Sequence, residues 1–258
     1  MNTTQSWRMI VSGTTDPSLN MGIDYALWES VRGGDAAPAL RFYEWKPPSV
    51  SIGYNQSPET LVHTEFCREN GFGIVRRPTG GSAIFHDIEL TYSFCGHEAW
   101  RREFARPLQS YLLICEGLRK VIGKLGVPLE VRGFSEGETS YTRQACFVLS
   151  SRHDLVWHER KIVGSAQKRD RRSFLQHGSI LLDIRRDAWD GIFREPVDYE
   201  KITCLRECLQ RKVTVEELIP ALRVGFEEIF GVSFEPGAIS DAEQERAESA
   251  SADIFPRL

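Results

Sequence analysis

The sequence predicts an α+β domain in which helices flank a mixed, largely antiparallel sheet. Short apolar segments typical of strands follow one another at hairpin spacing in two regions, residues 40–54 and 146–182. Of two long amphipathic segments, 108–125 separates the two regions and 214–230 follows them, without a regular strand–helix–strand alternation. Because a parallel α/β fold requires that alternation, the pattern favours the α+β class.

Length and composition indicate one large domain over residues 1–258. A chain of 258 residues, 41% hydrophobic and 26% charged, can bury roughly 70–75% of its unfolded surface without a disulfide or metal. The absence of an apolar run of about 18 residues and of a leader-like start predicts a cytoplasmic protein that no membrane holds. A net charge of −4 gives no general attraction to nucleic acid. The six cysteines lack zinc-ligand spacing, so no metal site is expected.

Start and stop signals place the first elements. A helix is expected from Asn20 to Arg32, ended by Gly33-Gly34. Strands at 40–45 and 50–54 are expected to form a hairpin around Pro47-Pro48. A second helix is expected from Ser57-Pro58 to Gly71.

The remaining elements follow the same logic. Strands are expected at 74–75, 83–85, 90–94, 146–148, 155–157, 161–163 and 178–182, with helices at 108–125 and 214–230. Thr214 with Glu217, and Ser240 with Glu243, have the spacing of capping boxes. A last short helix is expected after Ser240, and the Ala/Glu-rich tail over 240–258 that it begins could fray.

Four local features could carry chemistry. In the strand end and loop 76–82, Arg76 and Arg77 could bind a carboxylate or phosphate, and Gly80 and Gly81 could let backbone N–H groups approach a ligand. The alternative is a tight turn with two solvated arginines. The chain has no GxxxxGK[ST] phosphate-binding pattern.

The other three features are a lysine, two histidines and a cysteine. Lys161 leads into the small residues Gly164, Ser165 and Ala166, which would leave a strand surface open to a ligand. His177, before Gly178, and His86 could orient a ligand or could be satisfied core histidines. Cys146 would be reactive only beside a cation or a helix N-terminus, and otherwise it is packing.

Taken together, these segments resemble the biotin/lipoate protein ligase superfamily, in matching order over most of the chain. The resemblance lies in Asn20-Met21 with Asp24, in the segment 47–54, in 76–87 and in Lys161 with 164–166. It implies a catalytic domain related to class II aminoacyl-tRNA synthetases. It also implies an acyl-binding site formed by Arg76, Arg77, Gly80, Gly81, His86, Gly164, Ser165, Ala166, His177 and Gly178.

The superfamily divides by how the acyl group is activated, and ATP-dependent ligases need no cysteine. In one class of octanoyltransferases the nucleophilic cysteine lies three residues before the His-Gly pair, where this chain has Phe174. In the Gram-positive class it lies in an Ala-Cys-Phe segment, which Ala145-Cys146-Phe147 matches. The resemblance to this class implies catalysis by Cys146 and Lys161 without a cofactor. It also implies octanoyl-acyl carrier protein as donor and the glycine cleavage H protein, or another lipoyl-domain protein, as acceptor.

Three alternatives remain open at this point. The chain could be an ATP-dependent lipoate-protein ligase, although Ser82 replaces the third glycine common in those enzymes. It could be an amidotransferase that moves octanoate from H protein to another lipoyl domain, or a non-catalytic acyl-binding module. The basic run Lys168–Arg172 could dock an acidic carrier protein or could simply be solvated.

Overall fold

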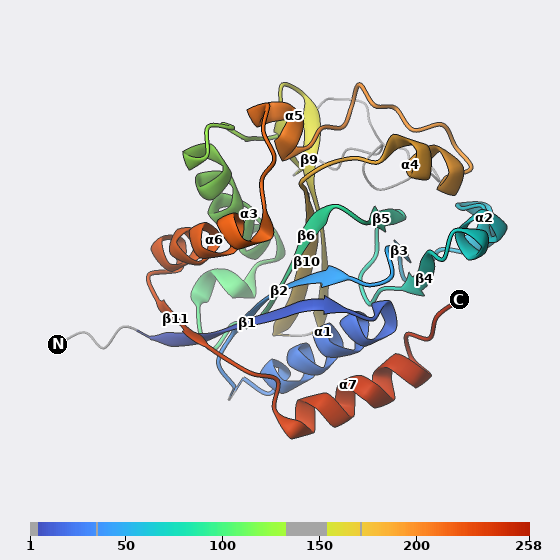
Figure 1. The fold of residues 1–258 in the computed structure, drawn as a ribbon. Helices are drawn as coiled ribbons and strands as arrows, with labels where there is room; N and C mark the ends of the chain where they lie inside the picture. The colour runs from blue at the N-terminus through green and yellow to red at the C-terminus, as the bar shows by residue number, and fades with distance from the viewer. Residues whose placement is uncertain (1–4, 35, 133–153, 171) are drawn as a thin grey trace.

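The main sheet has eight strands in the order β11–β1–β2–β6–β10–β9–β8–β7 (Figure 1). The computed structural model describes residues 5–34, 36–132, 154–170 and 172–258. The strands are β1 (Ser6–Thr15), β2 (Ala39–Trp45), β6 (Glu89–His97), β7 (Glu130–Val131), β8 (Leu155–Trp157), β9 (Arg160–Asp170), β10 (Ser173–Leu181) and β11 (Ser233–Pro236). β1 pairs in parallel with β2 and β11, and the other neighbours in this sheet pair antiparallel. The mixed, largely antiparallel sheet expected from the sequence is confirmed.

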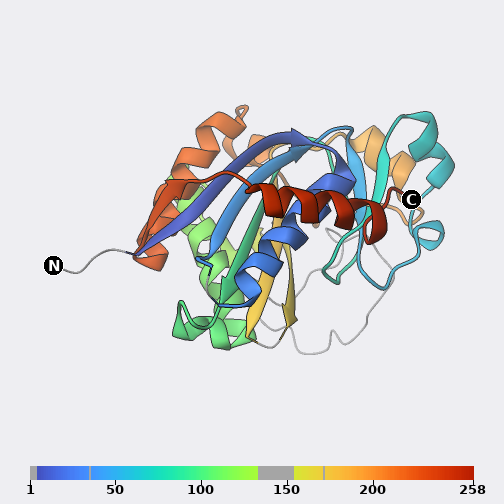
Figure 2. The same cartoon turned by 90° about the horizontal axis from the view of Figure 1, so that it is seen from below.

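Helices cover both faces of this sheet (Figures 1 and 2). On one face lie α1 (Pro17–Arg32) and α7 (Asp241–Asp253), and on the other α3 (Pro107–Lys124) and α6 (Val215–Phe230). The apolar stripes of α3 and α6 pack with Phe94 and Phe174 of the sheet in the largest core. None of the described helices is long and apolar enough to cross a membrane.

A second, smaller sheet corrects the predicted hairpin. β3 (Ser49–Ile52) does not pair with β2; it lies between β4 (Gly73–Arg76) and β5 (Ile84–His86). Pro47 and Pro48 have no N–H to continue a ladder with β2. Val50 is buried instead in a separate core with Trp189 of α4 (Arg186–Ile192). The turn therefore carries the chain from the large sheet into the small one.

The helix expected over 57–71 is divided in two. A 3₁₀ turn, η1 (Pro58–Thr60), precedes α2 (Thr64–Glu69), and Val62 between them forms a β-bridge with Phe193. Gly71, at φ 69°, occupies the left-handed position expected after the helix. Short elements that the sequence patterns did not indicate include η2 (Arg102–Ala105) and α5 (Leu205–Leu209).

The C-terminal segment begins with the helix expected after Ser240. Ser240 and Glu243 form a complete capping box that begins α7. This helix packs on α1 so closely that Gly22 faces the backbone of Ala247. Beyond it, Phe255 is buried and the Leu258 N–H donates to the carbonyl of Ile74. Contacts with α1 and with the small sheet hold the segment in place.

The Gly22 contact predicts a large stability effect. A Cβ built on Gly22 would lie 2.2 Å from the carbonyl oxygen of Ala247, so Gly22→Ala should lower the free energy of unfolding by about 1–3 kcal/mol. Gly123→Ala in α3 is the matched control, because nothing lies within 4 Å of its Cβ. It should stabilise the fold by about 0.5–1 kcal/mol. Urea titration measures both, and equal effects would contradict the packing described.

Candidate functional site

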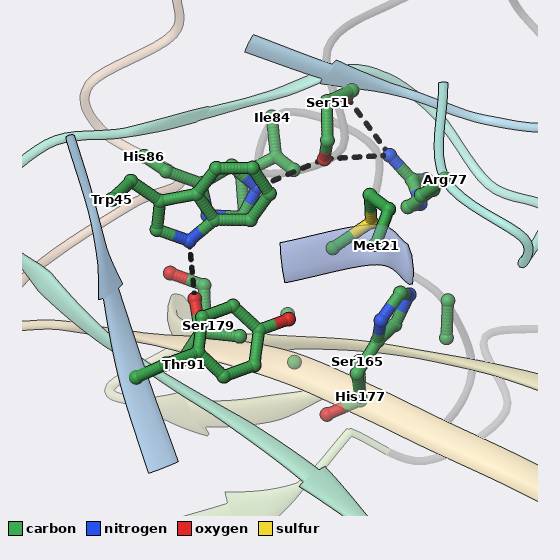
Figure 3. Close-up of a pocket in the computed structure, with 14 residues that line it drawn as sticks. Met21, Trp45, Ser51, Arg77, Ile84, His86, Thr91, Ser165, His177 and Ser179 are labelled. Atoms are coloured by element: carbon green, nitrogen blue, oxygen red, sulfur yellow. Dashed lines mark hydrogen bonds between the residues drawn. The ribbon is translucent and has the colours of Figure 1, made fainter. Parts of the chain in front are cut away.

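A pocket lies where helix α1 and strands β2, β6, β9 and β10 meet the small sheet (Figure 3). Its lining residues are Met21, Tyr43, Trp45, Ser51, Arg77, Ile84, His86, Thr91, Gly164, Ser165, Ala166, His177, Gly178 and Ser179. These include seven of the residues singled out from the sequence: Arg77, His86, Gly164, Ser165, Ala166, His177 and Gly178. Arg76, Gly80, Gly81 and Lys161 are not among them.

The floor of the pocket is the β9–β10 hairpin. Gly164 pairs with Ser179, and Ala166 pairs with His177. A Cβ on Gly178 would lie 2.5 Å from the carbonyl oxygen of Gly164 and 2.7 Å from the ring of Tyr92. The small residues therefore allow this close approach and keep the strand surface open, as the sequence pattern predicts.

The two loop arginines brace the chain. The Arg77 guanidinium donates to the carbonyl oxygens of Ser51 (2.9 Å), Gly80 (2.7 Å) and Ser82 (2.8 Å). Arg76 donates to three carbonyl oxygens in residues 53–56. Arg77 lines the pocket and also orders its loop, where it binds the carbonyl of Gly80. Arg76 holds the neighbouring turn instead.

His177 connects this loop to a buried carboxylate. Its Nδ1 lies 3.2 Å from Oδ2 of Asp24, and its Nε2 lies 2.6 Å from Oγ1 of Thr79. Because an ionised carboxylate only accepts hydrogen bonds, Nδ1 carries a proton that it donates to Asp24. The histidine thus joins α1, β10 and the loop.

The same Asp24 carboxylate receives two donors from β2. Arg41 Nη1 and the Tyr43 hydroxyl each donate to it at 2.8 Å. Burial raises the pKa of Asp24, but the His177 hydrogen bond and the Arg41 charge outweigh burial and hold it below its usual value. Asp24 is therefore a carboxylate in the folded protein.

A second buried carboxylate, Glu89, lies at another wall of the pocket. It accepts hydrogen bonds from the hydroxyls of Thr91 and Ser179, both at 2.6 Å, and from His86 Nδ1 at 3.2 Å. The His86 ring stacks on Trp45, with ring centres 4.0 Å apart. Burial lowers the pKa of His86 below its usual value, although the contact with Glu89 opposes this shift. His86 is therefore a neutral imidazole at pH 7.

Asp24 and Glu89 belong to the site but were not among the predicted site residues. For Asp24, the sequence does contain a feature that indicates a buried charge. Asp24 stands within an apolar helix repeat, and Arg41 stands within an apolar strand. Opposite charges in two segments that must both be buried indicate a buried ion pair. Glu89 had no comparable partner in the sequence.

Lys161 is a buried ammonium paired with Asp154. The Nζ–Oδ2 distance is 2.9 Å, and the two side chains are only 2% and 1% exposed. The Lys161 backbone is held as well, since its N–H donates to the carbonyl of Lys201 and its carbonyl accepts from the N–H of Thr203. Asp154 supplies the counter-charge that a buried ammonium needs.

A β-bulge determines which face of the sheet Lys161 occupies. Leu155 pairs with Val163, but Val156 pairs with Lys161, so Ile162 is the extra residue. Ile162 and Val163 both pack in the largest core, against α3 and α6. The bulge therefore turns Lys161 to the opposite face, which Gly164 and Ser179 share beside the pocket.

Cys146 lies outside the described residues. The five cysteines within the described part of the chain are Cys67, Cys95, Cys115, Cys204 and Cys208. Burial raises the pKa of each thiol, to about 11 for Cys67 and Cys204. These five are therefore protonated thiols at neutral pH.

The basic run Lys168–Arg172 is partly occupied by contacts within the chain. Arg169 donates to the hydroxyl of Ser110 and to the carbonyl of Phe104, and Arg172 pairs with Glu98. The ammonium of Lys168 lies over the ring of Trp28. Arg171 lies outside the described residues. These contacts do not favour carrier docking by this run.

The arrangement of elements is that of known lipoate-protein ligases. A crystal structure of lipoate-protein ligase A bound with ATP superposes with a TM-score of 0.82 at 23% identity, covering 96% of this chain and 95% of that one. The protein Ta0514 from T. acidophilum, with bound lipoic acid, gives 0.78 at 24% identity, covering 95% of each chain. At these identities the likeness concerns the fold.

Sequence comparison defines the family. Residues 16–227 match the model of the lipoyl protein ligase A/B catalytic domain, so the chain belongs to that family. It is 37% identical to "Octanoyltransferase LipM" of Kyrpidia tusciae, over 96% of both chains. The relatives of that name from Moorella thermoacetica and Bacillus subtilis are 35% and 33% identical, over 98% and 93% of this chain and 98% and 91% of theirs. The resemblance noted in the sequence is confirmed.

The neutral His86 predicts a pH-dependent stability. Because its pKa is lowered in the folded state, the unfolded chain binds the proton more readily, and the free energy of unfolding should fall as pH drops below 6.5. A single group can contribute a slope of at most about 1.4 kcal/mol per pH unit. Denaturant titrations between pH 5 and 8 should show a weaker slope in His86→Gln.

His63→Gln is the control for this experiment, because His63 is exposed. It should keep the slope of the unchanged protein. An identical slope in His86→Gln would show that His86 does not titrate as described.

Proposed function

We propose that this protein transfers an octanoyl group from octanoyl-acyl carrier protein to a lysine of a lipoyl-domain protein. The donor's octanoyl group would pass through a thioester on Cys146. The observation that carries the proposal is the buried Lys161–Asp154 pair, turned by a bulge to the pocket face, in a chain similar over 98% of its length to an octanoyltransferase. The glycine cleavage H protein is the proposed first acceptor, and the cytoplasm is the proposed site of the reaction.

Lys161 would activate the thiol and stabilise the developing negative charge. A free thiol with a pKa of about 8.5 is only a few per cent ionised at pH 7. An ammonium about 4 Å away contributes roughly 4 kcal/mol at an effective dielectric of 20, while a drop of two pKa units requires about 2.7. Asp154 reduces this net field, but its contact with Lys161 fixes the lysine in position.

The reaction then proceeds in two balanced steps. The Cys146 thiolate attacks the donor thioester, and the carrier's thiolate leaves and takes up a proton. The neutral amine of the acceptor lysine attacks the Cys146 thioester, forms an amide, loses a proton and releases the cysteine as thiolate. Conversion of a thioester to an amide is downhill, so ATP is not consumed.

In this proposal the alkyl chain would enter the pocket and lie along the hairpin. Gly164, Gly178 and Ala166 expose backbone and small side chains there, while Met21 and Ile84 add apolar contacts. His177, fixed by Asp24 and Thr79, would hold one wall. In this proposal Arg76, Gly80 and Gly81 shape the loop and do not touch the chain.

A covalent intermediate is the direct test. Incubation with octanoyl-acyl carrier protein without ATP should give one octanoyl adduct by intact-mass measurement, and Cys146→Ser should remove it. Adding H protein should transfer the adduct to the acceptor. Acylation of H protein that needs ATP and survives Cys146→Ser would instead identify a ligase.

The same assay separates the remaining alternatives. Octanoyl-H protein as the only effective donor would identify an amidotransferase, and binding of the carrier without turnover would identify a binding module. Either result would overturn the proposed donor reaction.

The activating role of Lys161 predicts a pH profile. Iodoacetamide should alkylate Cys146 faster than the five described cysteines, because burial raises the pKa of each of those thiols. In Lys161→Gln the apparent pKa of alkylation at Cys146 should rise by about 1–2 units. Cys67→Ala, in α2 and outside the pocket lining, should leave that profile unchanged. An unshifted profile in Lys161→Gln would exclude the role.

A further inference from the structure

Hydrogen-bond donors around the pocket converge on its two buried carboxylates. Thr91 and Ser179 donate their hydroxyl protons to Glu89. Trp45 Nε1 in turn donates to Oγ1 of Thr91 at 2.8 Å. All three of these donors line the pocket, yet each is committed to an acceptor in its wall.

The proton positions on His86 follow from the same accounting. The carboxylate of Glu89 only accepts, so Nδ1 of His86 carries the proton and Nε2 is the acceptor. Ser51 therefore donates its hydroxyl proton to Nε2 at 2.8 Å, and its oxygen faces Arg77 Nη1. Figure 3 shows this line of contacts from Arg77 through Ser51 to His86.

Asp24, the second buried carboxylate, likewise accepts the donors of pocket residues. It accepts the Tyr43 hydroxyl proton and the His177 Nδ1 proton, and both residues line the pocket. Across both sides, seven polar lining residues hold their donors turned to partners in the protein. Polar side chains therefore form much of the pocket wall, but their seven donors are already hydrogen-bonded within the protein when an alkyl chain enters.

We propose that Glu89 selects the chemical class of the acyl chain, favouring an unsubstituted saturated chain over a hydroxylated one. This inference rests on the proposed acyl transfer. An alkyl chain entering the pocket leaves the donors of His86, Thr91 and Ser179 bonded as before. A hydroxyl on the chain must give up water, and its oxygen finds these donors taken by Glu89. Glu89 acts through these three side chains and is a positioning residue.

The size of the selection follows from comparable pockets. A pocket without polar partners rejects an added hydroxyl by about 100-fold. Removing Glu89 leaves the donors of His86, Thr91 and Ser179 unpaired. Binding of an alkyl chain then becomes less favourable, whereas a hydroxyl on the chain can accept hydrogen bonds from these donors. The discrimination should then fall about tenfold or more.

The test compares octanoyl-acyl carrier protein with its 3-, 5- and 7-hydroxyoctanoyl analogues, through the ratio of kcat/KM values. The unchanged protein should prefer octanoyl over each analogue. Glu89→Ala should lower kcat/KM for octanoyl and reduce its preference over at least one analogue by tenfold or more. Ser179→Ala removes one donor and leaves Glu89 in place, so it should retain the preference.

Glu243→Ala is the matched control, because Glu243 is a buried carboxylate that pairs with Arg8 and lies outside the pocket lining. It should lower stability without changing the ratios. If Glu89→Ala does not fold, Glu89→Gln keeps the shape and adds amide donors, and it too should lower the preference. Unchanged ratios in the folded Glu89 variant would overturn the inference, whereas no octanoyl transfer by the unchanged protein would overturn the proposed function itself.

Discussion

The burial of the Asp24 carboxylate is the constraint on which the site depends. A charge with no exposure to water must be matched by a cation and satisfied by hydrogen bonds. Arg41 supplies the charge, while Tyr43 and His177 complete the set. Those partners fix α1 against β2 and β10, and Thr79 joins the loop to them through His177. The need to neutralise and hydrogen-bond the buried Asp24 carboxylate therefore fixes these walls of the pocket relative to one another.

Lys161, near the beginning of β9, is a second buried charge that is matched by an opposite charge. Its ammonium is tolerated in the interior because Asp154 lies beside it, and its backbone is fixed by residues 201 and 203. The extra residue Ile162 decides its face. Charge, backbone pairing and a one-residue irregularity together give the lysine a defined position, which a flexible side chain would not have by itself.

Much of this could be predicted from the sequence, and the failures have physical causes. The helix stripes, capping signals and glycine-rich strands gave the fold class and most elements. Seven pocket residues were selected: Arg77 as a possible anion-binding group at a strand end, and the other six because they are small or polar residues beside apolar strand positions. The β2–β3 hairpin was wrong because local spacing cannot show which sheet will bury Val50. Glu89 was missed because one of its donors, Ser179, lies 90 positions away along the chain. Asp154 was missed because its pairing with Lys161 depends on the bulge at Ile162, which the spacing does not show. The position of Cys146 stays a prediction.

Helix α1 serves two neighbours at once. Gly22 receives α7, while Asp24, two residues further on, organises the pocket. Separation of α7 would expose Met21, Tyr43 and Trp45, which line the pocket and pack in one core cluster with Ala250 of α7. The C-terminal helix, α1 and the acyl site should accordingly open as one cooperative unit, visible as matched amide exchange rates, although α7 lies more than 200 positions from α1 along the chain.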